Sequence, residues 1–273
     1  MEVLDTVAEP PSRLIALGGD GTVNTAVGWL LKKEYRCPVG IVPAGTGNNL
    51  CRGLGVPLEP EAAFRLALSG EKTRELDAIE IRTGDSEADP LYMIQTSAFG
   101  FPADIALQYD RLRRHRLFRW LVFPLGPSLY RLLALAGLAS QKVREWRGKD
   151  LLDVRCSFPG EELRETILAG FVGNEKSLGG GFVPCPKAAF DDGLIDVCFL
   201  RARTGASYLK TFRDVIRGTH LSAESTVVYR QTPGPVEIEL SMKVPLLVDG
   251  DLPVVSDRYT YSLIPRRIEL IVG

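Results

Sequence analysis

The first part of the chain alternates between short apolar runs and a helical pattern. Apolar runs at Leu14–Leu17 and Val39–Val42 each end in a segment rich in glycine and small polar residues. Between them, Asn24–Lys33 carries apolar residues at helical spacing, and Glu61–Ser69 predicts a further helix with proline before it and glycine after it. We therefore expect buried parallel strands that alternate with helices.

From about Arg74 the pattern changes to short runs in which apolar and polar residues alternate. Alternation with a period of two is typical of strands that bury one face, so we expect an antiparallel β domain. The predicted strands are Glu75–Arg82, Leu91–Ala98, Leu151–Phe158, Glu165–Gly173, Leu194–Leu200, Thr226–Tyr229, Val236–Leu240, Val254–Leu263 and a final strand at Arg267–Val272.

Two polar loops follow the first two predicted strands, Gly18–Asn24 and Pro43–Asn49. The glycines of the first loop lack the Cβ atoms that would keep a phosphate away from the backbone. The helix that follows offers unpaired N–H groups to an anion. Because the carboxyl ends of neighbouring parallel strands meet at one edge of a sheet, the two loops together predict a cleft for nucleotide phosphates.

In sequence, these two loops resemble the diacylglycerol kinase catalytic family, which includes bacterial diacylglycerol kinases, sphingosine kinases and ceramide kinases. Further motifs follow in the order that the family shows. They are Gly173-Asn174, Gly179-Gly180-Gly181, Asp191–Val197 and Val248–Asp251. The Gly-Gly-Asp-Gly-Thr motif alone is shared with NAD kinases and resembles phosphofructokinases, so the later motifs carry the distinction.

The resemblance implies a fold of two domains. A Rossmann-like (phosphofructokinase-like) parallel α/β domain would occupy residues 1–75, and an antiparallel β-sandwich domain for the lipid substrate would occupy residues 76–263. Residues 264–273 would pack back onto the first domain. Only about a dozen residues precede the first predicted strand, whereas the family carries further strand–helix units there, so we expect the α/β domain to be incomplete at its start.

The resemblance assigns the first two loops to ATP. Asp20 would face the metal–nucleotide complex, because a carboxylate is repelled by bare phosphates unless Mg²⁺ lies between them. An aspartate is also common in glycine-rich turns, and that is the alternative. Thr25 stands where relatives commonly have Glu. The expected nucleotide-binding residues are Gly18, Gly19, Asp20, Gly21, Thr22, Val23, Asn24, Thr25, Gly45, Thr46 and Asn48.

The late motif Asp249-Gly250-Asp251 is assigned by the same resemblance to catalysis, together with Asp20. Asp251 would accept the proton, and Asp249 would lie close to the metal and the acceptor. The family usually has Glu in place of Asp251, so the reach of the carboxylate is one methylene shorter. A surface hairpin turn is the alternative interpretation.

A second site is implied at Asp192, which with the backbone carbonyls of Ala189 and Leu194 would bind Mg²⁺ away from the transfer centre. One carboxylate with carbonyl oxygens and waters is acceptable ligation for Mg²⁺. A simple Asp-Asp-Gly turn that opens the following strand explains these residues equally well.

The composition limits the classes of partner that the protein is expected to bind. The net charge is −1, which gives no general attraction to nucleic acid. Five scattered cysteines without metal-ligand spacing, and a start without the features of a signal peptide, indicate a cytosolic protein.

Residues 109–147 mix arginines with aromatic residues, and prolines and Arg131 interrupt their apolar run. This segment is either an amphipathic helix that covers the β domain or a docking face for anionic lipid headgroups.

The function predicted from these features is that of an ATP- and Mg²⁺-dependent lipid kinase in lipid metabolism and phospholipid biosynthesis. It would phosphorylate a hydroxyl of a diacylglycerol-like or sphingoid lipid, and it would be cytoplasmic and peripherally bound to the membrane. Two alternatives stay open: a catalytically impaired remnant that binds lipid or nucleotide, and an NAD kinase. The identity of the lipid and the formation of a homodimer also stay open.

Overall fold

The computed structural model describes residues 4, 6–45, 47–85, 87–114, 151–178, 181–201, 207–223 and 225–273. The predicted site residue Thr46, the glycines at 179 and 180, and residues 115–147 of the predicted docking segment lie outside this described part.

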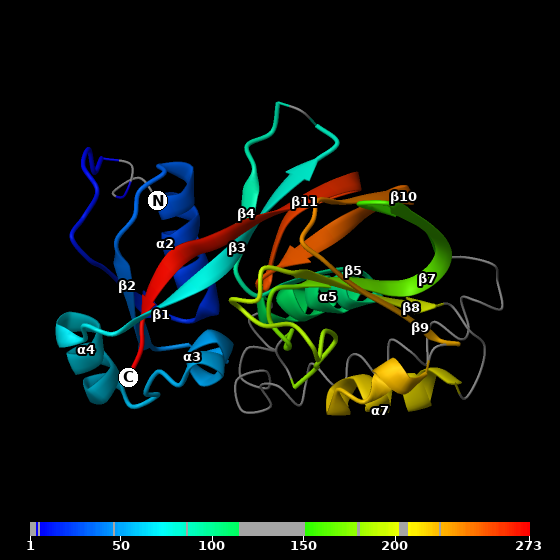
Figure 1. The fold of residues 1–273 in the computed structure, drawn as a ribbon. Helices are drawn as coiled ribbons and strands as arrows, with labels where there is room; N and C mark the ends of the chain where they lie inside the picture. Colours follow the sequence, from blue (N-terminus) through cyan, green and yellow to red (C-terminus); the bar gives the residue numbers. More distant parts are fainter. Residues whose placement is uncertain are drawn as a thin grey trace.

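The start of the chain forms the parallel part of a sheet (Figure 1). Strand β1 (Leu14–Gly18) pairs parallel with β2 (Pro38–Pro43), and β2 pairs parallel with the end of β11 (Asp251–Ile271). Helix α2 (Asp20–Lys32) connects β1 to β2, and α3 (Asn49–Leu54) and α4 (Pro60–Ser69) follow. The strands and helices that periodicity predicted in this part are present.

Helices cover both faces of these parallel strands. Val23, Val27 and other apolar residues of α2 pack against Ala16 and Ile41 on one face. On the other face α4 approaches so closely that a Cβ atom on Gly40 would lie 2.6 Å from the Cβ of Ala67. The close approach explains why glycine stands in the middle of a buried strand.

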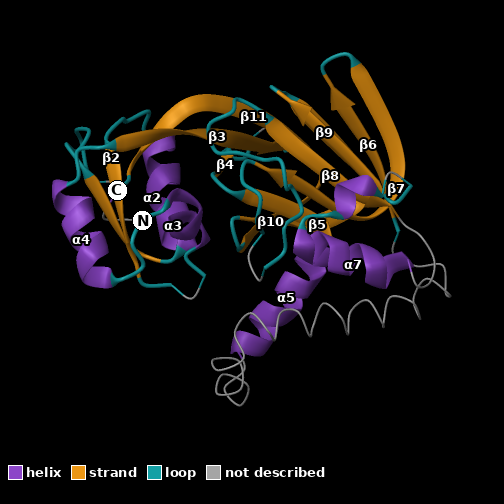
Figure 2. Cartoon of the chain, turned by 60° about the horizontal axis from the view of Figure 1, so that its bottom comes forward, coloured by secondary structure: helices purple, strands orange, loops and turns teal. Residues whose placement is uncertain are grey.

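The rest of the chain forms the antiparallel part of the same sheet, with the path β1-β2-β11-β10-β5-β7-β8-β9 and with β3, β4 and β6 paired beside that path. Figure 2 shows α5 (Phe101–Arg114) and α7 (Ser207–Arg217) beside these strands. The antiparallel strands besides β11 are β3 (Thr73–Thr83), β4 (Leu91–Met93), β5 (Thr96–Gly100), β6 (Leu152–Phe158), β7 (Glu161–Gly173), β8 (Ile195–Arg201), β9 (Val227–Thr232) and β10 (Val236–Val248).

The predicted order of an α/β part followed by a β-rich part is confirmed, but the strands are divided differently. Leu91–Ala98 was predicted as one strand and forms two, β4 and β5. Val254–Leu263 and Arg267–Val272 were predicted as two strands and belong to one, β11, with an irregularity between Ile264 and Ile268. Because β3 and β11 run through both parts, the predicted domain boundaries at residues 75 and 263 fall inside strands.

Aromatic side chains fill the core of the antiparallel part. Phe99 lies with its ring centroid 6.3 Å from that of Phe199 and 6.4 Å from that of Tyr259. A Cβ atom on Gly170 would lie 2.1 Å from the Phe99 ring, so this position on β7 has room only for glycine. Within the described residues, no helix is long and apolar enough to cross a membrane.

His220 is fully buried at the start of a short 3₁₀ helix, His220–Ser222. Its Nε2 atom lies 3.0 Å from the carbonyl oxygen of Pro184 and 3.7 Å from the Sγ of Cys198. Burial lowers the pKa of this imidazole below its ordinary value of 6.5, with hydrogen bonds to backbone opposing the shift. The folded protein therefore holds His220 neutral.

We expect the folded protein to lose stability on mild acidification, because the unfolded chain binds a proton at His220 that the folded state excludes. As the pH falls from 6.5 toward the lowered pKa of the folded state, this group alone lowers the free energy of unfolding by up to about 1.4 kcal/mol per pH unit, and below that pKa it causes no further loss. Urea unfolding of the wild type and of His220→Gln between pH 7 and pH 5 measures the effect. The variant should show a smaller dependence on pH, and equal slopes in the two proteins would contradict the prediction.

Candidate active site

The two glycine-rich loops contact each other through their backbones. The N–H of Ala44 donates to the carbonyl oxygen of Gly18 at 2.9 Å. A Cβ atom on Gly45 would lie 2.5 Å from the Cα of Gly19, and a Cβ on Gly18 would lie 2.2 Å from Oγ1 of Thr22. Only glycine fits at these contacts, so the loops expose backbone where a ligand can approach.

The second loop is held in shape by two side chains. Asn48 has a left-handed φ of 49°, and its amide both accepts from the N–H of Gly45 (3.0 Å) and donates to the carbonyl of Gly45 (2.9 Å). Asp20, in the first turn of α2, accepts from the N–H groups of Asn49 and Leu50 at 3.1 Å each. Its Oδ2 also accepts from the side-chain amide of Asn49 at 3.5 Å. Asp20 therefore caps the first turn of the neighbouring α3, and its Oδ1 keeps an acceptor site.

The late acidic motif forms the tight turn between β10 and β11. Asp249 and Gly250 have φ values of 47° and 97°, as a two-residue hairpin with an Asp-Gly sequence requires. The side chain of Asp249 turns inward and is only 7% exposed. The hairpin predicted as the alternative is therefore present, but the carboxylate at its first position is buried.

The Asp249 carboxylate accepts hydrogen bonds on both oxygens. The N–H groups of Ile94, Gln95 and Thr96 donate to it at 2.8–2.9 Å. In the orientation that satisfies its hydrogen bonds, the side-chain amide of Asn24 donates to Asp249 at 3.1 Å and to the carbonyl of Tyr92 at 3.3 Å. These donors use the acceptor sites of the carboxylate. They also explain why Leu91–Ala98 is not one strand, since these N–H groups leave the sheet ladder.

Asp251 is exposed and faces the first loop. Its Oδ2 lies 3.5 Å from the position that a Cβ on Gly21 would take, at the start of α2. The positive end of the helix dipole favours a negative charge there. The early glycine loop and the late acidic turn therefore lie side by side, with Asn24 bonded to Asp249. We refer to the site that these two segments form together as the crevice.

A further carboxylate, Glu175, lies near Asp20 and follows the Gly173-Asn174 motif. It is buried, and one oxygen accepts from the N–H (2.9 Å) and hydroxyl (2.8 Å) of Ser177. Burial raises the pKa of Glu175, the Ser177 bonds oppose the shift, and the charge of Asp20 adds to it. Its Oε1 lies 3.8 Å from the position that a Cβ on Gly53 of α3 would take. Sequence reasoning missed Glu175 because nothing in its motif indicates that the side chain turns toward α3.

Burial likewise raises the pKa of Asp249 to about 7, against the backbone hydrogen bonds that favour its charged form. The charge of Asp20 adds to the rise, as it does for Glu175. The crevice therefore concentrates negative charge from Asp20, Glu175, Asp249 and Asp251. A phosphate ligand is compatible with such a site only if cations accompany it.

The donor set fits a magnesium–nucleotide complex. Asp20 has an oxygen lone pair to offer, and Asp251 receives no hydrogen bond from the described residues. Carboxylate oxygens are the protein ligands that Mg²⁺ prefers. Asp20 is thus the residue that would hold the cation, since Asp249 is occupied by its N–H donors and Asp251 is the carboxylate predicted to accept the proton.

Two further residues predicted to bind the nucleotide, Val23 and Thr25, make contacts within the protein. The Val23 side chain is 2% exposed and belongs to the core, and its N–H donates to the carbonyl of Gly19. The hydroxyl of Thr25 donates to the carbonyl of Gly21 at 2.9 Å, within its own helix. The contacts of these two side chains are therefore with the core and with their own helix, and they do not indicate a role in nucleotide binding.

The predicted Asp192 site is a turn fixed to β3. Asp192 accepts from the N–H of Leu194 at 3.0 Å, and Gly193 donates to Asp77 at 2.8 Å. Burial raises the pKa of Asp192, and the charges of Asp77 and Asp191 add to it. Among the described residues, no group of three His, Cys, Asp or Glu side chains is placed to hold a metal. A site made of Asp192 with the carbonyls of Ala189 and Leu194 stays a prediction.

The Gly173-Asn174 motif joins the end of β7 to β3 and to the link between β4 and β5. The side-chain amide of Asn174 donates to the carbonyls of Asp77 (2.9 Å) and Ile94 (2.8 Å). Its N–H donates to the carbonyl of Gln95 at 2.8 Å. Asn174 therefore fixes the segment whose N–H groups hold Asp249.

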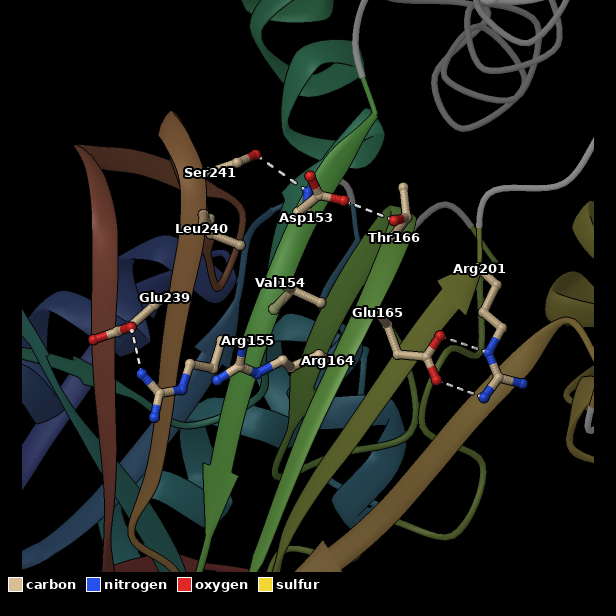
Figure 3. Close-up of a pocket in the computed structure, with 10 residues that line it drawn as sticks. All are labelled: Asp153, Val154, Arg155, Arg164, Glu165, Thr166, Arg201, Glu239, Leu240 and Ser241. Atoms are coloured by element: carbon tan, nitrogen blue, oxygen red, sulfur yellow. Dashed lines mark hydrogen bonds and ion pairs between the residues drawn. The ribbon is translucent and has the colours of Figure 1, made fainter.

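A groove of about 740 Å³ on the antiparallel part is a poorer candidate (Figure 3). Its charges offset one another, since Arg201 pairs with Glu165 at 2.6 Å and Arg155 with Glu239 at 3.7 Å. None of the predicted site residues lines it. The lining residues are Asp153, Val154, Arg155, Arg164, Glu165, Thr166, Arg201, Glu239, Leu240 and Ser241.

Comparison with known proteins shows the family to which the chain belongs. Residues 2–81 match the model of the diacylglycerol kinase catalytic domain, and residues 124–272 match that of the YegS C-terminal NAD kinase beta sandwich-like domain. A probable lipid kinase YegS-like of Chromohalobacter salexigens is 31% identical over 257 residues, which cover 93% of this chain and 74% of that protein. The chain belongs to the diacylglycerol kinase family. The family and the kinase class predicted from the motifs are confirmed.

Other relatives agree with this membership. A diacylglycerol kinase of Mycobacterium tuberculosis is 30% identical over 249 residues, which cover 90% of this chain and 72% of that protein. The crystal structure of a putative diacylglycerol kinase from Bacillus anthracis superimposes with a TM-score of 0.71 at 20% identity, covering all of this chain and 79% of that one. This similarity to a solved structure shows that the α/β part and the β-rich part have the same fold in both proteins.

We expect Gly45→Ala to lower the free energy of unfolding by about 1–3 kcal/mol, because the added methyl group overlaps Gly19 and forces the two loops apart. The matched control is Gly28→Ala, since a Cβ at Gly28 within α2 meets no atom within 4 Å. That variant should keep or gain stability, by up to about 1 kcal/mol. Urea unfolding compares the two, and equal stability would show that the loops do not touch as described.

Proposed function

We propose that the protein is an ATP- and Mg²⁺-dependent lipid kinase that phosphorylates a hydroxyl of a diacylglycerol-like or sphingoid lipid. The observation that carries the proposal is the position of Asp251, an exposed carboxylate that faces the start of α2 across one crevice. Family membership supports the reaction class, and relatives are named lipid kinase and diacylglycerol kinase.

Each group of the crevice has a role in this proposal. The backbone of the loops around Gly19 and Gly45 binds the phosphates, and we assign this part of the sheet to the Rossmann-like class that uses such loops. Asp251 accepts the proton of the lipid hydroxyl as the hydroxyl oxygen bonds to the γ-phosphorus of ATP, and the bond from that phosphorus to the bridging oxygen breaks so that ADP leaves. Mg²⁺, bound with ATP, supplies charge compensation for the phosphates. Asp249 fixes the conformation of the turn and thereby positions Asp251.

The proposal places the reaction at a membrane surface, because the acceptor is a lipid. Contact through residues 109–147 and a cytoplasmic location are parts of this proposal that derive from the sequence. Thr25 and Asp251, which replace the Glu of relatives, favour a catalytically impaired protein as the second candidate. Activity of the wild type decides between them.

We expect the wild type to transfer phosphate from MgATP to lipid in mixed vesicles. Asp251→Asn should lower kcat by about 10²- to 10⁴-fold without loss of stability, since a general base contributes about that much and Asp251 is exposed. Asp249→Asn should lower activity and also cost about 1–3 kcal/mol of stability, because an amide cannot accept from all its N–H donors.

The control variant is Glu237→Gln, an exposed carboxylate on β10 outside the crevice. Radioactive phosphate transfer and urea unfolding are measured on the same preparations. Equal activity in the wild type, Asp251→Asn and Glu237→Gln would contradict the role of Asp251. Phosphorylation of NAD instead of lipid would contradict the substrate class.

A further inference from the structure

We propose that Arg52 binds the phosphates of ATP at the second glycine loop. This inference rests on the proposed function, since it concerns the nucleotide of the same crevice. Nothing in the sequence pattern singles out Arg52, which lies beyond the loop motif on α3. Three features of its surroundings support the assignment.

The first feature is the attachment of Arg52 to the loop itself. Its Nε donates to the carbonyl oxygen of Gly47 at 3.2 Å. Gly47 belongs to the segment that Asn48 closes through its two bonds to Gly45. The guanidinium is therefore held at the phosphate loop before any ligand arrives, which limits the entropy lost on binding.

The second feature is that the guanidinium is exposed and has donors to spare. Among the described residues, Arg52 makes no ion pair, and its Nη1 and Nη2 groups donate to no protein acceptor. Two other arginines that follow in the chain are engaged: Arg65 pairs with Glu61 at 2.5 Å, and Arg74 binds Asp191 through two bonds of 2.9 Å. A free pair of Nη groups matches two oxygens of one phosphate.

The third feature is the charge of the crevice. Asp20 and Arg52 approach the same residue, because Oδ2 of Asp20 lies 3.2 Å from the position of a Cβ on Gly47. Asp20, Glu175, Asp249 and Asp251 give the crevice an acidic character that repels a triphosphate. A cation fixed at the loop offsets part of this repulsion, beside the Mg²⁺ that Asp20 would hold.

The test measures binding of MgATP and of adenosine by calorimetry to the wild type, Arg52→Gln and Arg52→Lys. Loss of a charge-assisted phosphate contact should raise the Kd for MgATP about 10- to 100-fold in Arg52→Gln. Lysine, which keeps the charge but not the fork, should restore part of the affinity. Adenosine, which has no phosphate, should bind all three proteins equally.

The matched control is Arg65→Gln, which removes an exposed arginine from the neighbouring helix α4 and should leave the Kd for MgATP unchanged. The KM for ATP should follow the Kd, while the KM for lipid should stay constant. A Kd for MgATP in Arg52→Gln within about twofold of the wild type would overturn the assignment. Equal weakening of MgATP and adenosine would also overturn it, because that pattern indicates a general disturbance of the loop.

The same measurements separate this inference from the proposed function. If the wild type binds MgATP and Arg52→Gln does not, while neither phosphorylates lipid, the role of Arg52 stands and the lipid kinase proposal fails. If the wild type phosphorylates lipid and Arg52→Gln keeps its affinity for MgATP, the lipid kinase proposal stands and the role of Arg52 fails. If the wild type does not bind MgATP, both fail.

Discussion

The buried carboxylate of Asp249 is the group on which the crevice depends. It accepts from three successive N–H groups, those of Ile94, Gln95 and Thr96, which lie more than 150 positions away in the chain. A carboxylate that is almost excluded from water is stable only with such partners, because an unpaired buried charge is costly. The bond from Asn24 then ties the same carboxylate to α2. One side chain thus joins the late turn, the link between β4 and β5, and the first glycine loop.

This arrangement gives different tasks to carboxylates that look equivalent in the sequence. Asp249 is saturated and holds the turn, whereas Asp251, two positions later, is exposed and faces α2. Asp20 has a structural and a binding task, since it caps α3 and keeps an acceptor site for a ligand. Burial raises the pKa of Asp249 and Glu175, and the charge of Asp20 adds to the rise. In the proposed function, a cation bound with the nucleotide would reduce the repulsion between these carboxylates.

The sequence was sufficient for the features that depend on local patterns. Apolar runs ending in glycines predicted β1, β2 and the contact region of their loops, and periodicity predicted α2 and α4 within a few residues. The continuity of β11 was missed because Arg266 takes a left-handed φ of 48° with its N–H bonded to Asp77, and no local signal marks that bond. The division of Leu91–Ala98 was missed for the same reason, since its N–H groups bind a distant carboxylate. The sequence pattern does not indicate a role for Glu175 or Arg52, because their roles depend on the groups that lie beside them in the folded protein.

The most direct test of this account is a double-mutant cycle between Asn24 and Asp249, measured by urea unfolding of the wild type, Asn24→Ala, Asp249→Ala and the double variant. Two residues in one hydrogen-bonded network should show a coupling energy of about 1–2 kcal/mol. That result would establish the contact between α2 and the acidic turn in solution. Additive effects, with a coupling near zero, would show that the two sides of the crevice do not meet and would contradict the account.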